Sequence, residues 1–200
     1  MVGDLDKNDH GSVTKVVADC LPHVNSGLLY KKREELIPVL LVTIRHHEDA
    51  KVRNTLTKLL FTLIKDPNVV QRKMIMEGCT SLASIIGLDK TNEELLPHCW
   101  ENIEDEKEGR RILVADSCSA LAPYVRPELR SSLMFSILQQ LISDSSPDVR
   151  IAVSKNLAVL LTYFEDGDKW NYVKDVFTTL AFDSDKSVSS FFQIFTLLLF

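Results

Sequence analysis

The stretch Asp144-Ser145-Ser146-Pro147-Asp148-Val149-Arg150 decides the fold. Aspartate and serine before a proline end a helix, and the proline then fits the first turn of a new one. Asp148 can accept hydrogen bonds from the free amides of that first turn. Asp66-Pro67-Asn68 and Asp183-Ser184-Asp185 have the same character. Each of these three stretches therefore predicts a tight turn between two helices.

The first and last residues of that stretch recur with a fixed period. They form an aspartate series and an arginine series at intervals of 39 residues: Asp66, Asp105, Asp144 and Asp183, and Arg33, Arg72, Arg111 and Arg150. Five units align without a gap. Gly27 replaces the aspartate in the first unit and Ser189 the arginine in the last, because end units often depart from the pattern. Such a period is typical of stacked helical hairpins.

The apolar residues keep the same register. Two columns mark a first helix: Val17, Leu56, Leu95, Met134 and Val173, and Leu21, Leu60, Cys99, Leu138 and Phe177. Two others mark a second helix: Leu36, Ile75, Val114, Val153 and Phe192, and Thr43, Leu82, Leu121, Leu160 and Leu199. Spacings of four and seven residues place side chains on one helix face. We predict no sheet, and helices over residues 12–24, 33–46, 50–65, 69–87, 92–104, 109–123, 128–143, 148–164, 169–182 and 187–200.

The alignment of the first repeat unit has two possible interpretations. Leu36-Ile37-Pro38 and Leu95-Leu96-Pro97 look alike but lie 59 residues apart, which is one and a half periods. Both could open a first helix. The 39-residue alignment instead places the former stretch in a second helix. The order of helices is the same either way, but the face that this helix presents is not.

The bulk composition is that of a folded chain without nucleic-acid partners. The 200 residues are 45% hydrophobic and 26% charged, which is ordinary for a globular protein. The net charge is -5, and no basic stripe of the kind that binds nucleic acid is visible. Lys31-Lys32-Arg33 is the longest basic run, and Glu34-Glu35 follows it. This order favours a solvated helix start over an anion site.

The sequence shows no targeting or membrane signal. Its start, Met1-Val2-Gly3-Asp4-Leu5-Asp6, lacks the patterns of a secretory signal and of myristoylation. The longest apolar run, Leu197 to Phe200, is far shorter than the ~20 residues that span a bilayer. The four cysteines are then expected to be reduced thiols. We expect a cytoplasmic protein without direct membrane insertion, with a flexible segment over residues 1–11 and a single domain over residues 12–200.

The residues that most suggest chemistry have structural explanations. Cys79, Cys99 and Cys118 fall in the apolar columns, so packing explains them better than metal binding or nucleophilic catalysis. His46-His47-Glu48-Asp49 suggests a metal site, but adjacent histidines on a helix point apart, which favours a solvated loop. No phosphate loop, nucleophile elbow or zinc-protease motif occurs. We predict no catalytic residues, no cofactor and no metal.

Two charged features keep two interpretations each. The arginine series could pair with aspartates of the same or the next unit, or it could bind an acidic partner or phosphate. The matching aspartate series favours pairing. Two acidic stretches could be solvated edges or contact surfaces for a basic partner: Glu101, Glu104, Asp105, Glu106 and Glu108, and Glu165-Asp166-Gly167-Asp168.

Several motifs resemble known families. The period of 39, the aspartate after the first helix and a Val-Arg pair at the start of the second (Val52-Arg53, Val149-Arg150) resemble HEAT repeats. The scaffold subunit of protein phosphatase 2A has the same period. Over about residues 50–175 the chain is similar to RELCH-like proteins, which are Rab11-binding proteins with LisH, coiled-coil and HEAT regions. The similarity is carried by Gln71-Arg72-Lys73-Met74-Ile75, Glu94-Leu95-Leu96-Pro97-His98-Cys99-Trp100-Glu101, Arg110-Arg111-Ile112-Leu113-Val114-Ala115-Asp116-Ser117-Cys118 and Arg130-Ser131-Ser132-Leu133.

The resemblance implies both a fold and a role. The fold is an all-α, right-handed α-solenoid of about five HEAT-type, armadillo-like hairpins. RELCH-like proteins sit at recycling endosomes and the trans-Golgi network. They bind the small GTPase Rab11 and an oxysterol-binding protein, and they tether membranes for non-vesicular cholesterol transport. No partner-binding residue carries over, so the partner site stays unassigned.

The expected function is a non-catalytic protein-binding scaffold. One alternative is a generic HEAT scaffold that assembles an enzyme complex such as a phosphatase. Another is an enzyme with an unrecognised site, which a deep pocket with converging titratable groups would support. The chain has neither a LisH motif nor heptads, so we expect a monomeric fragment of the HEAT region that is truncated at its C-terminal end.

The run Phe191 to Phe200 ends inside a predicted second helix without a polar cap. Because the ends of a repeat array need a polar outer face for solubility, we expect concentration-dependent association through this end. Phe195→Asp should reduce it in sedimentation velocity experiments. A chain that stays monodisperse at high concentration, with or without the substitution, contradicts this expectation.

Overall fold

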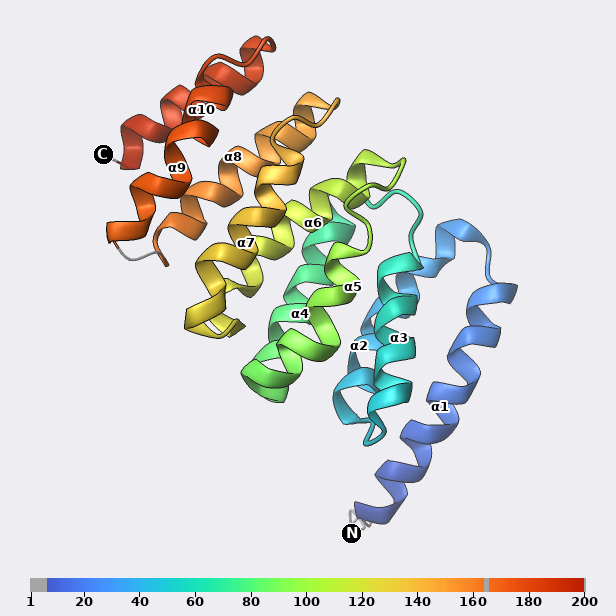
Figure 1. Ribbon diagram of the computed structural model, residues 1–200. Coiled ribbons are helices and arrows are strands. Elements are labelled where there is room, and N and C mark those ends of the chain that lie inside the picture. Colours follow the sequence, from blue (N-terminus) through green and yellow to red (C-terminus); the bar gives the residue numbers. More distant parts are fainter. Residues whose placement is uncertain (1–6, 164–165, 200) are drawn as a thin grey trace.

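A computed structural model describes the backbone of residues 7–163 and 166–199, and the side chains of residues 11–29, 32–163 and 174–193. Figure 1 shows helices following one another across the molecule, and no strand occurs among the described residues. The helices are α1 (Lys7–Gly27), α2 (Ile37–His46), α3 (Ala50–Thr62), α4 (Val69–Lys90), α5 (Leu96–Trp100), α6 (Glu108–Leu121), α7 (Pro127–Leu141), α8 (Pro147–Leu161), α9 (Asp166–Ala181) and α10 (Lys186–Leu199). The prediction of an all-helical chain is confirmed.

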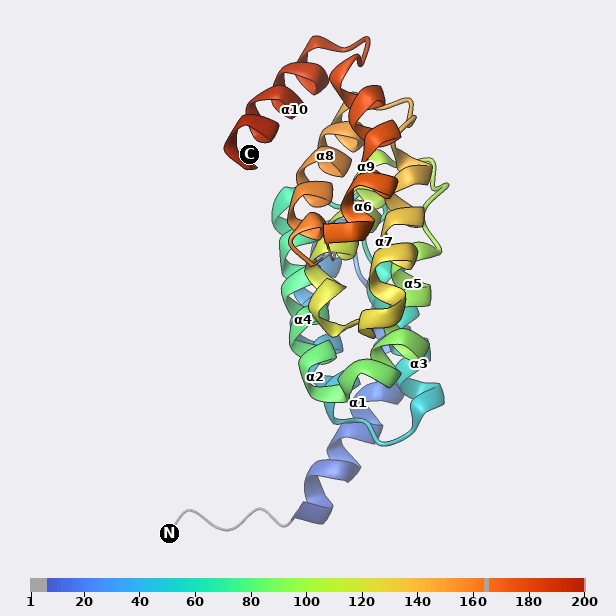
Figure 2. The ribbon, with the colours of Figure 1, turned by 60° about the vertical axis from the view of Figure 1, so that its left-hand side comes forward.

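The helices form two rows. In one row α2 contacts α4, α4 contacts α6, α6 contacts α8 and α8 contacts α10. The odd-numbered helices lie on the other side, where α1 contacts α3 and α7 contacts α9. Figure 2 shows α4, α8 and α10 on one side and α3, α5 and α7 on the other. The row of α2 is the row of second helices in the 39-residue alignment, so Leu36-Ile37-Pro38 belongs to a second helix.

The core follows the predicted columns. Leu56, Leu95 and Met134 of the first-helix stripe are buried, as are Val114 and Val153 of the second-helix stripe. In the last unit the rings of Phe177 and Phe192 meet edge to face, with centroids 4.8 Å apart. Edge-to-face contact is a favoured geometry for aromatic pairs. Val173 and Leu199, also assigned to the columns, have side chains outside the described set.

Local capping explains several helix starts. Asp49 accepts a hydrogen bond from the Lys51 amide at the start of α3, at 2.8 Å. Asn68 and Gln71 form a capping box at the start of α4, which satisfies two free backbone amides. The expected cap of α8 by Asp148 is wrong. Ser146 is the cap residue, and Asp148 lies inside the helix.

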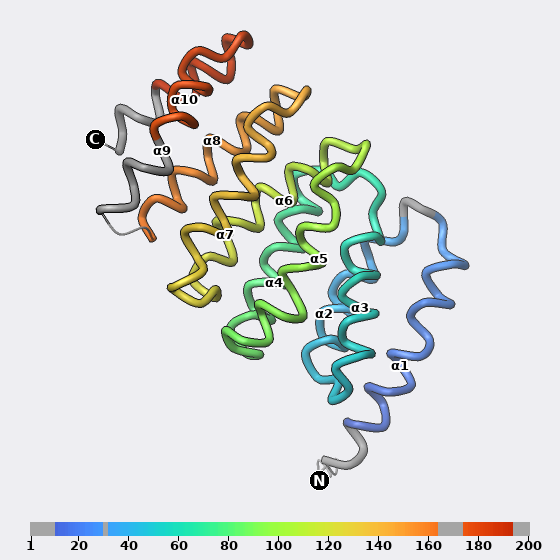
Figure 3. The backbone as a smooth tube through the Cα atoms, in the orientation of Figure 1, coloured from blue at the N-terminus to red at the C-terminus, as the bar shows by residue number. Residues whose placement is uncertain are grey.

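The regular alternation of helices is interrupted in the middle of the chain. Gly87 has a φ of 83° inside α4, a left-handed conformation that only glycine adopts at little cost. The chain then continues through a π-helical turn, η2 (Thr91–Leu95), into the short α5. Two 3-10 turns, η1 (Tyr30–Leu36) and η3 (Ala122–Tyr124), precede α2 and follow α6. Figure 3 shows the chain path from α4 through η2 into α5.

A close approach between α6 and the α3–α4 turn depends on glycine. A Cβ at Gly109 would stand 2.5 Å from Asp66 Oδ1 and 2.6 Å from the Pro67 carbonyl oxygen. The carbonyl belongs to the backbone, so it cannot rotate away as a flexible side chain could. The start of α6 therefore fits against the preceding unit only because residue 109 has no side chain.

We expect Gly109→Ala to lower the free energy of unfolding by about 1–3 kcal/mol, the usual cost of overpacking a tight contact. Gly27→Ala is the matched control, because nothing lies within 4 Å of a Cβ at that position. Urea unfolding followed by circular dichroism measures both. Equal stability of the two variants would contradict the assigned role of Gly109.

Candidate protein-binding groove

The last two members of the arginine series join successive units. Arg111 Nε and Nη2 donate to the Asp144 carboxylate at 2.6 and 2.9 Å, and its Nη1 donates to the Asp105 carbonyl at 2.7 Å. Arg150 repeats this arrangement with the Asp183 carboxylate and the Asp144 carbonyl. Bidentate pairs of this kind are among the strongest polar contacts in proteins. For Arg111 and Arg150 the predicted pairing with the aspartate of the next unit is confirmed, so their guanidinium groups are not available to a phosphate.

A third bridge of this kind lies outside the series. Arg53 Nε and Nη2 donate to Glu94 at 3.0 and 2.7 Å, and Nη1 donates to the His47 and Glu48 carbonyls. Arg53 lies in α3, in the row of first helices. The interpretation of Val52-Arg53 as the start of a second helix is therefore wrong. Val149-Arg150 does open a second helix.

Arg72 departs from the series. Its Nη1 donates to the Pro67 carbonyl at 2.8 Å, and its Nε lies 3.6 Å from Asp116 Oδ2 in α6. Asp105, the expected partner, instead pairs with Arg110 of its own unit at 2.9 Å. Arg110 also donates to the Thr62 carbonyl at the end of α3. Arg110 thus makes the link between these two units that Arg72 was expected to make.

The cysteines of the apolar columns pack inside the structure. Cys79, Cys99 and Cys118 are buried, and all four cysteines are free thiols. Burial raises the pKa of the Cys99 and Cys118 thiols, so neither is a ready source of thiolate. Core packing of the cysteines, as predicted, agrees with these positions. No group of metal-ligating side chains occurs among the described residues.

The histidine pair and the first acidic stretch each contain both exposed residues and residues held by internal contacts. His46 is exposed, whereas His47 is buried and its Nδ1 accepts a hydrogen bond from the Asp49 amide at 3.1 Å. The expectation of a fully solvated loop is therefore wrong for His47. Of the first acidic stretch, Asp105 is paired internally, while Glu108 reaches the surface of a groove. The side chains of the second stretch, residues 165–168, lie outside the described set.

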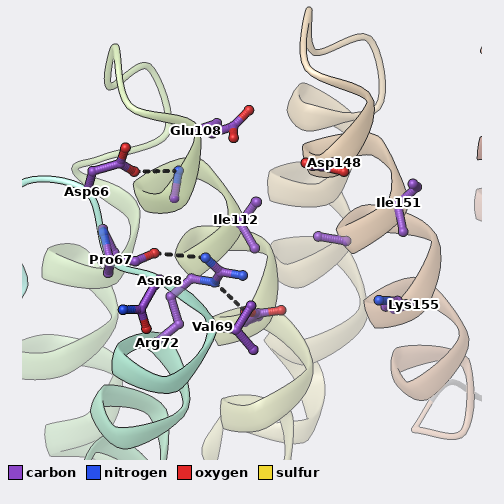
Figure 4. A pocket seen from close by; sticks show the side chains of 13 residues that line it. Asp66, Pro67, Asn68, Val69, Arg72, Glu108, Ile112, Asp148, Ile151 and Lys155 are labelled. Atoms are coloured by element: carbon purple, nitrogen blue, oxygen red, sulfur yellow. Dashed lines mark hydrogen bonds and ion pairs between the residues drawn. The ribbon is translucent and has the colours of Figure 1, made fainter.

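The groove crosses the row of second helices. A hollow of about 620 Å³ lies over the starts of α4, α6 and α8. A second hollow of about 380 Å³ continues between the same helices, and Val69, Arg72 and Asp116 line both. Figure 4 shows the first hollow, with Asp66 and Glu108 at one edge and Asp148 on the next helix. Sequence reasoning did not find this groove, because its walls come from three different units.

The floor of the groove is a polar network. Asn156 Nδ2 donates to Asp116 Oδ1 at 3.0 Å and to the Ala152 carbonyl at 2.8 Å. The Ser119 hydroxyl donates to the Asn156 side-chain oxygen. Burial raises the pKa of Asp116, and the hydrogen bond from Asn156 and the charge of Arg72 offset this only in part. Asn156 of α8 thus joins Asp116 and Ser119 of α6, and the ion pair between Arg72 and Asp116 at 3.6 Å adds α4 to the network.

The walls of the groove carry charged and aliphatic side chains. Its walls include neither histidine nor cysteine. The titratable groups are spread across three helices, and Asp116 is already bonded to Asn156. Nucleophilic or acid–base catalysis needs a nucleophile and a base within hydrogen-bond reach of each other, and these walls offer no such pair.

Comparison with known protein families identifies the family of the chain. The family model for the N-terminal domain of the RAB11-binding protein RELCH matches residues 6–195. This chain belongs to the RELCH family. Zebrafish (Danio rerio) RAB11-binding protein RELCH homolog is 44% identical over 186 residues, which are 92% of this chain and 16% of the relative. The human RAB11-binding protein RELCH is 43% identical over 186 residues, which are 92% of this chain and 15% of the relative.

The chain thus spans about one sixth of the length of these RELCH relatives. The family resemblance drawn from the sequence is confirmed. The named relatives are RAB11-binding proteins. Among the described residues no helix combines the length and apolar character needed to cross a membrane.

The bridge to Asp183 predicts a pH dependence of stability. The hydrogen bond from Arg150 holds the pKa of Asp183 below its usual value. A carboxylate whose pKa is lower in the folded state stabilises the fold above its unfolded pKa, about 4, and loses this contribution as the pH falls through the folded value. We expect Asp183→Asn to lower the free energy of unfolding at neutral pH by about 1.5–3 kcal/mol.

The difference between Asp183→Asn and the unmodified chain should shrink as the pH falls below about 4. Urea unfolding at several pH values measures it. Asp175→Asn, an exposed position on α9, is the control and should change stability little at any pH. A difference for Asp183→Asn that stays constant down to acid pH would show that the bridge does not stabilise through its charge.

Proposed function

We propose that this chain is a non-catalytic protein-binding scaffold that contributes to the recognition of a Rab11-type small GTPase. The observation that carries the proposal is membership in a family whose named relatives are RAB11-binding proteins. The groove supports a scaffold because its walls form a wide contact surface without a nucleophile–base pair.

We further propose that the two rows of helices are an α-solenoid of HEAT type with a right-handed superhelix. Two features support this. The buried columns repeat every 39 residues, and each second helix contacts the second helix of the next unit. In such arrays each unit contacts mainly its neighbours, and the array as a whole offers an extended binding surface.

The cellular part of the proposal rests on the family resemblance. Within a longer protein, the chain would act at recycling endosomes and the trans-Golgi network, peripheral to the membrane. It would support non-vesicular cholesterol transport together with an oxysterol-binding protein. The alternative is a generic HEAT scaffold that assembles an enzyme complex such as a phosphatase, with no preference for a GTPase.

A pulldown separates these two functions. The tagged chain is incubated with Rab11 locked in the GTP-bound or the GDP-bound state, with a second GTP-locked Rab as the specificity control. We expect retention of GTP-locked Rab11 only, because an effector binds the conformation that the γ-phosphate orders. Binding that is absent, or equal for the two nucleotide states, contradicts the proposal and favours the generic scaffold.

A further inference from the structure

We propose that the groove across α4, α6 and α8 binds an extended segment of a partner protein that carries a lysine or arginine at about every third residue, with small aliphatic residues between them. This inference rests on the proposed scaffold function and names the chemistry of one of its partners. It follows from the charge of the groove, the spacing of its walls and the aliphatic surface on them.

The cations of the groove are already engaged. Arg72 contacts Asp116 and the Pro67 carbonyl, and Lys155 Nζ lies 5.1 Å from the centroid of the Phe191 ring. Lys73, which lines the second hollow, lies 3.7 Å from Glu77 on the same helix. Each of these cations therefore already faces a group of the chain itself. The charge that remains for recognition is that of the carboxylates at the rim.

Two carboxylates on adjacent helices define this rim. Glu108 begins α6 and Asp148 is the second residue of α8, and both are exposed. The Glu108 carboxylate accepts a hydrogen bond from the uncharged Ser146 hydroxyl at 2.8 Å. A helix N-terminus carries about half a positive charge, which offsets part of each carboxylate. The rim is therefore negative and complements a basic segment.

The spacing of the helices sets the spacing of the partner's charges. Packed helices lie about 8–10 Å apart, so this is the expected separation of carboxylates on α6 and α8. An extended chain advances about 3.1–3.4 Å per residue. Three residues then span one helix-to-helix step, and five or six span the whole groove from α4 to α8.

Aliphatic surface lies between the charges. Val69 at the start of α4 is 70% exposed, and Ile151 of α8 is partly exposed in the same hollow. Small apolar side chains of a bound segment would cover this surface. Burial of that area would add to affinity, whereas the charges would mainly set orientation and the rate of association.

Labelled synthetic peptides test the proposal by fluorescence anisotropy. The probe repeats lysine, valine and proline, and the proline keeps it extended and monomeric. Three matched peptides replace every lysine by glutamate, replace every valine by serine, or gather the same residues into a block of lysines and a block of valines. We expect the repeating lysine peptide to bind most tightly, and its affinity to fall as salt is added.

Variants of the chain locate the site. Asp148→Asn should weaken binding of the lysine peptide by about two- to fivefold, since an exposed charge contact is modest. Glu108→Lys with Asp148→Lys should weaken it by about tenfold or more, through repulsion. Glu128→Gln is the matched control, because Glu128 follows Pro127 at the start of α7 as Asp148 follows Pro147 in α8. Val69→Ser should weaken binding of the repeating lysine peptide, which carries the valines. It should leave binding of the peptide with serine in place of valine unchanged.

Any of three results would contradict the proposal that the groove binds a basic segment. The lysine and glutamate peptides could bind equally, or the repeating and block peptides could bind equally. Asp148→Asn and Glu128→Gln could also lower the affinity for the lysine peptide equally. Association of the chain with itself that competes with the peptide in sedimentation would assign the groove to a second copy instead. The circular dichroism spectrum and the melting temperature of each variant, compared with those of the unmodified chain, check that the fold is retained.

The failure of this inference can be told apart from the failure of the proposed function. The same variants enter the Rab11 pulldown. If the unmodified chain retains GTP-locked Rab11 but does not bind the lysine peptide, only the proposal of a basic segment in the groove is contradicted. If it binds the peptide but does not discriminate the nucleotide state of Rab11, only the GTPase role is overturned.

Discussion

The arginine bridge is the polar interaction that holds neighbouring repeat units in register. A turn between two helices leaves backbone carbonyls without partners. Arg111 and Arg150 donate to these carbonyls in the turn before their own helix and, with the same guanidinium, to a carboxylate of the next unit. Arg53 does the same one row away, with Glu94. Because the guanidinium is planar and rigid, each bridge fixes the separation and the orientation of two neighbouring units.

The groove lies where this regular bridging is interrupted. Arg72 turns to Asp116 of the facing helix, and Asp105 pairs with Arg110 instead. Gly109 lets the start of α6 approach the preceding turn closely. Arg72 thus does not make the repeated pairing between the second and third units, and it contacts Asp116 in the groove instead. The floor of the groove is built from Asp116, Ser119 and Asn156.

The 39-residue periodicity predicted the features that depend on a single helix face, which are the buried columns and the order of the helices. Burial of an apolar side chain needs only the correct face, so the columns and helix order follow from spacing, and Leu56 and Val153 are buried as expected. Contacts that break the period did not follow. The partner of Arg53 is 41 residues away, whereas the bridges of the series join residues 33 apart. The bend at Gly87 depends on one backbone angle. The groove depends on side chains of three units meeting, which no single-helix pattern encodes.

The distribution of the thiols makes the chain its own spectroscopic reporter. Cys20 is exposed on α1, whereas Cys79, Cys99 and Cys118 are enclosed between the rows. Alkylating dyes react with thiolates, so the folded chain accepts a fluorophore at Cys20 without any engineered residue. The enclosed thiols become reactive only when neighbouring units separate. Their rate of labelling, read by mass spectrometry residue by residue, would then report how often the middle of the chain opens.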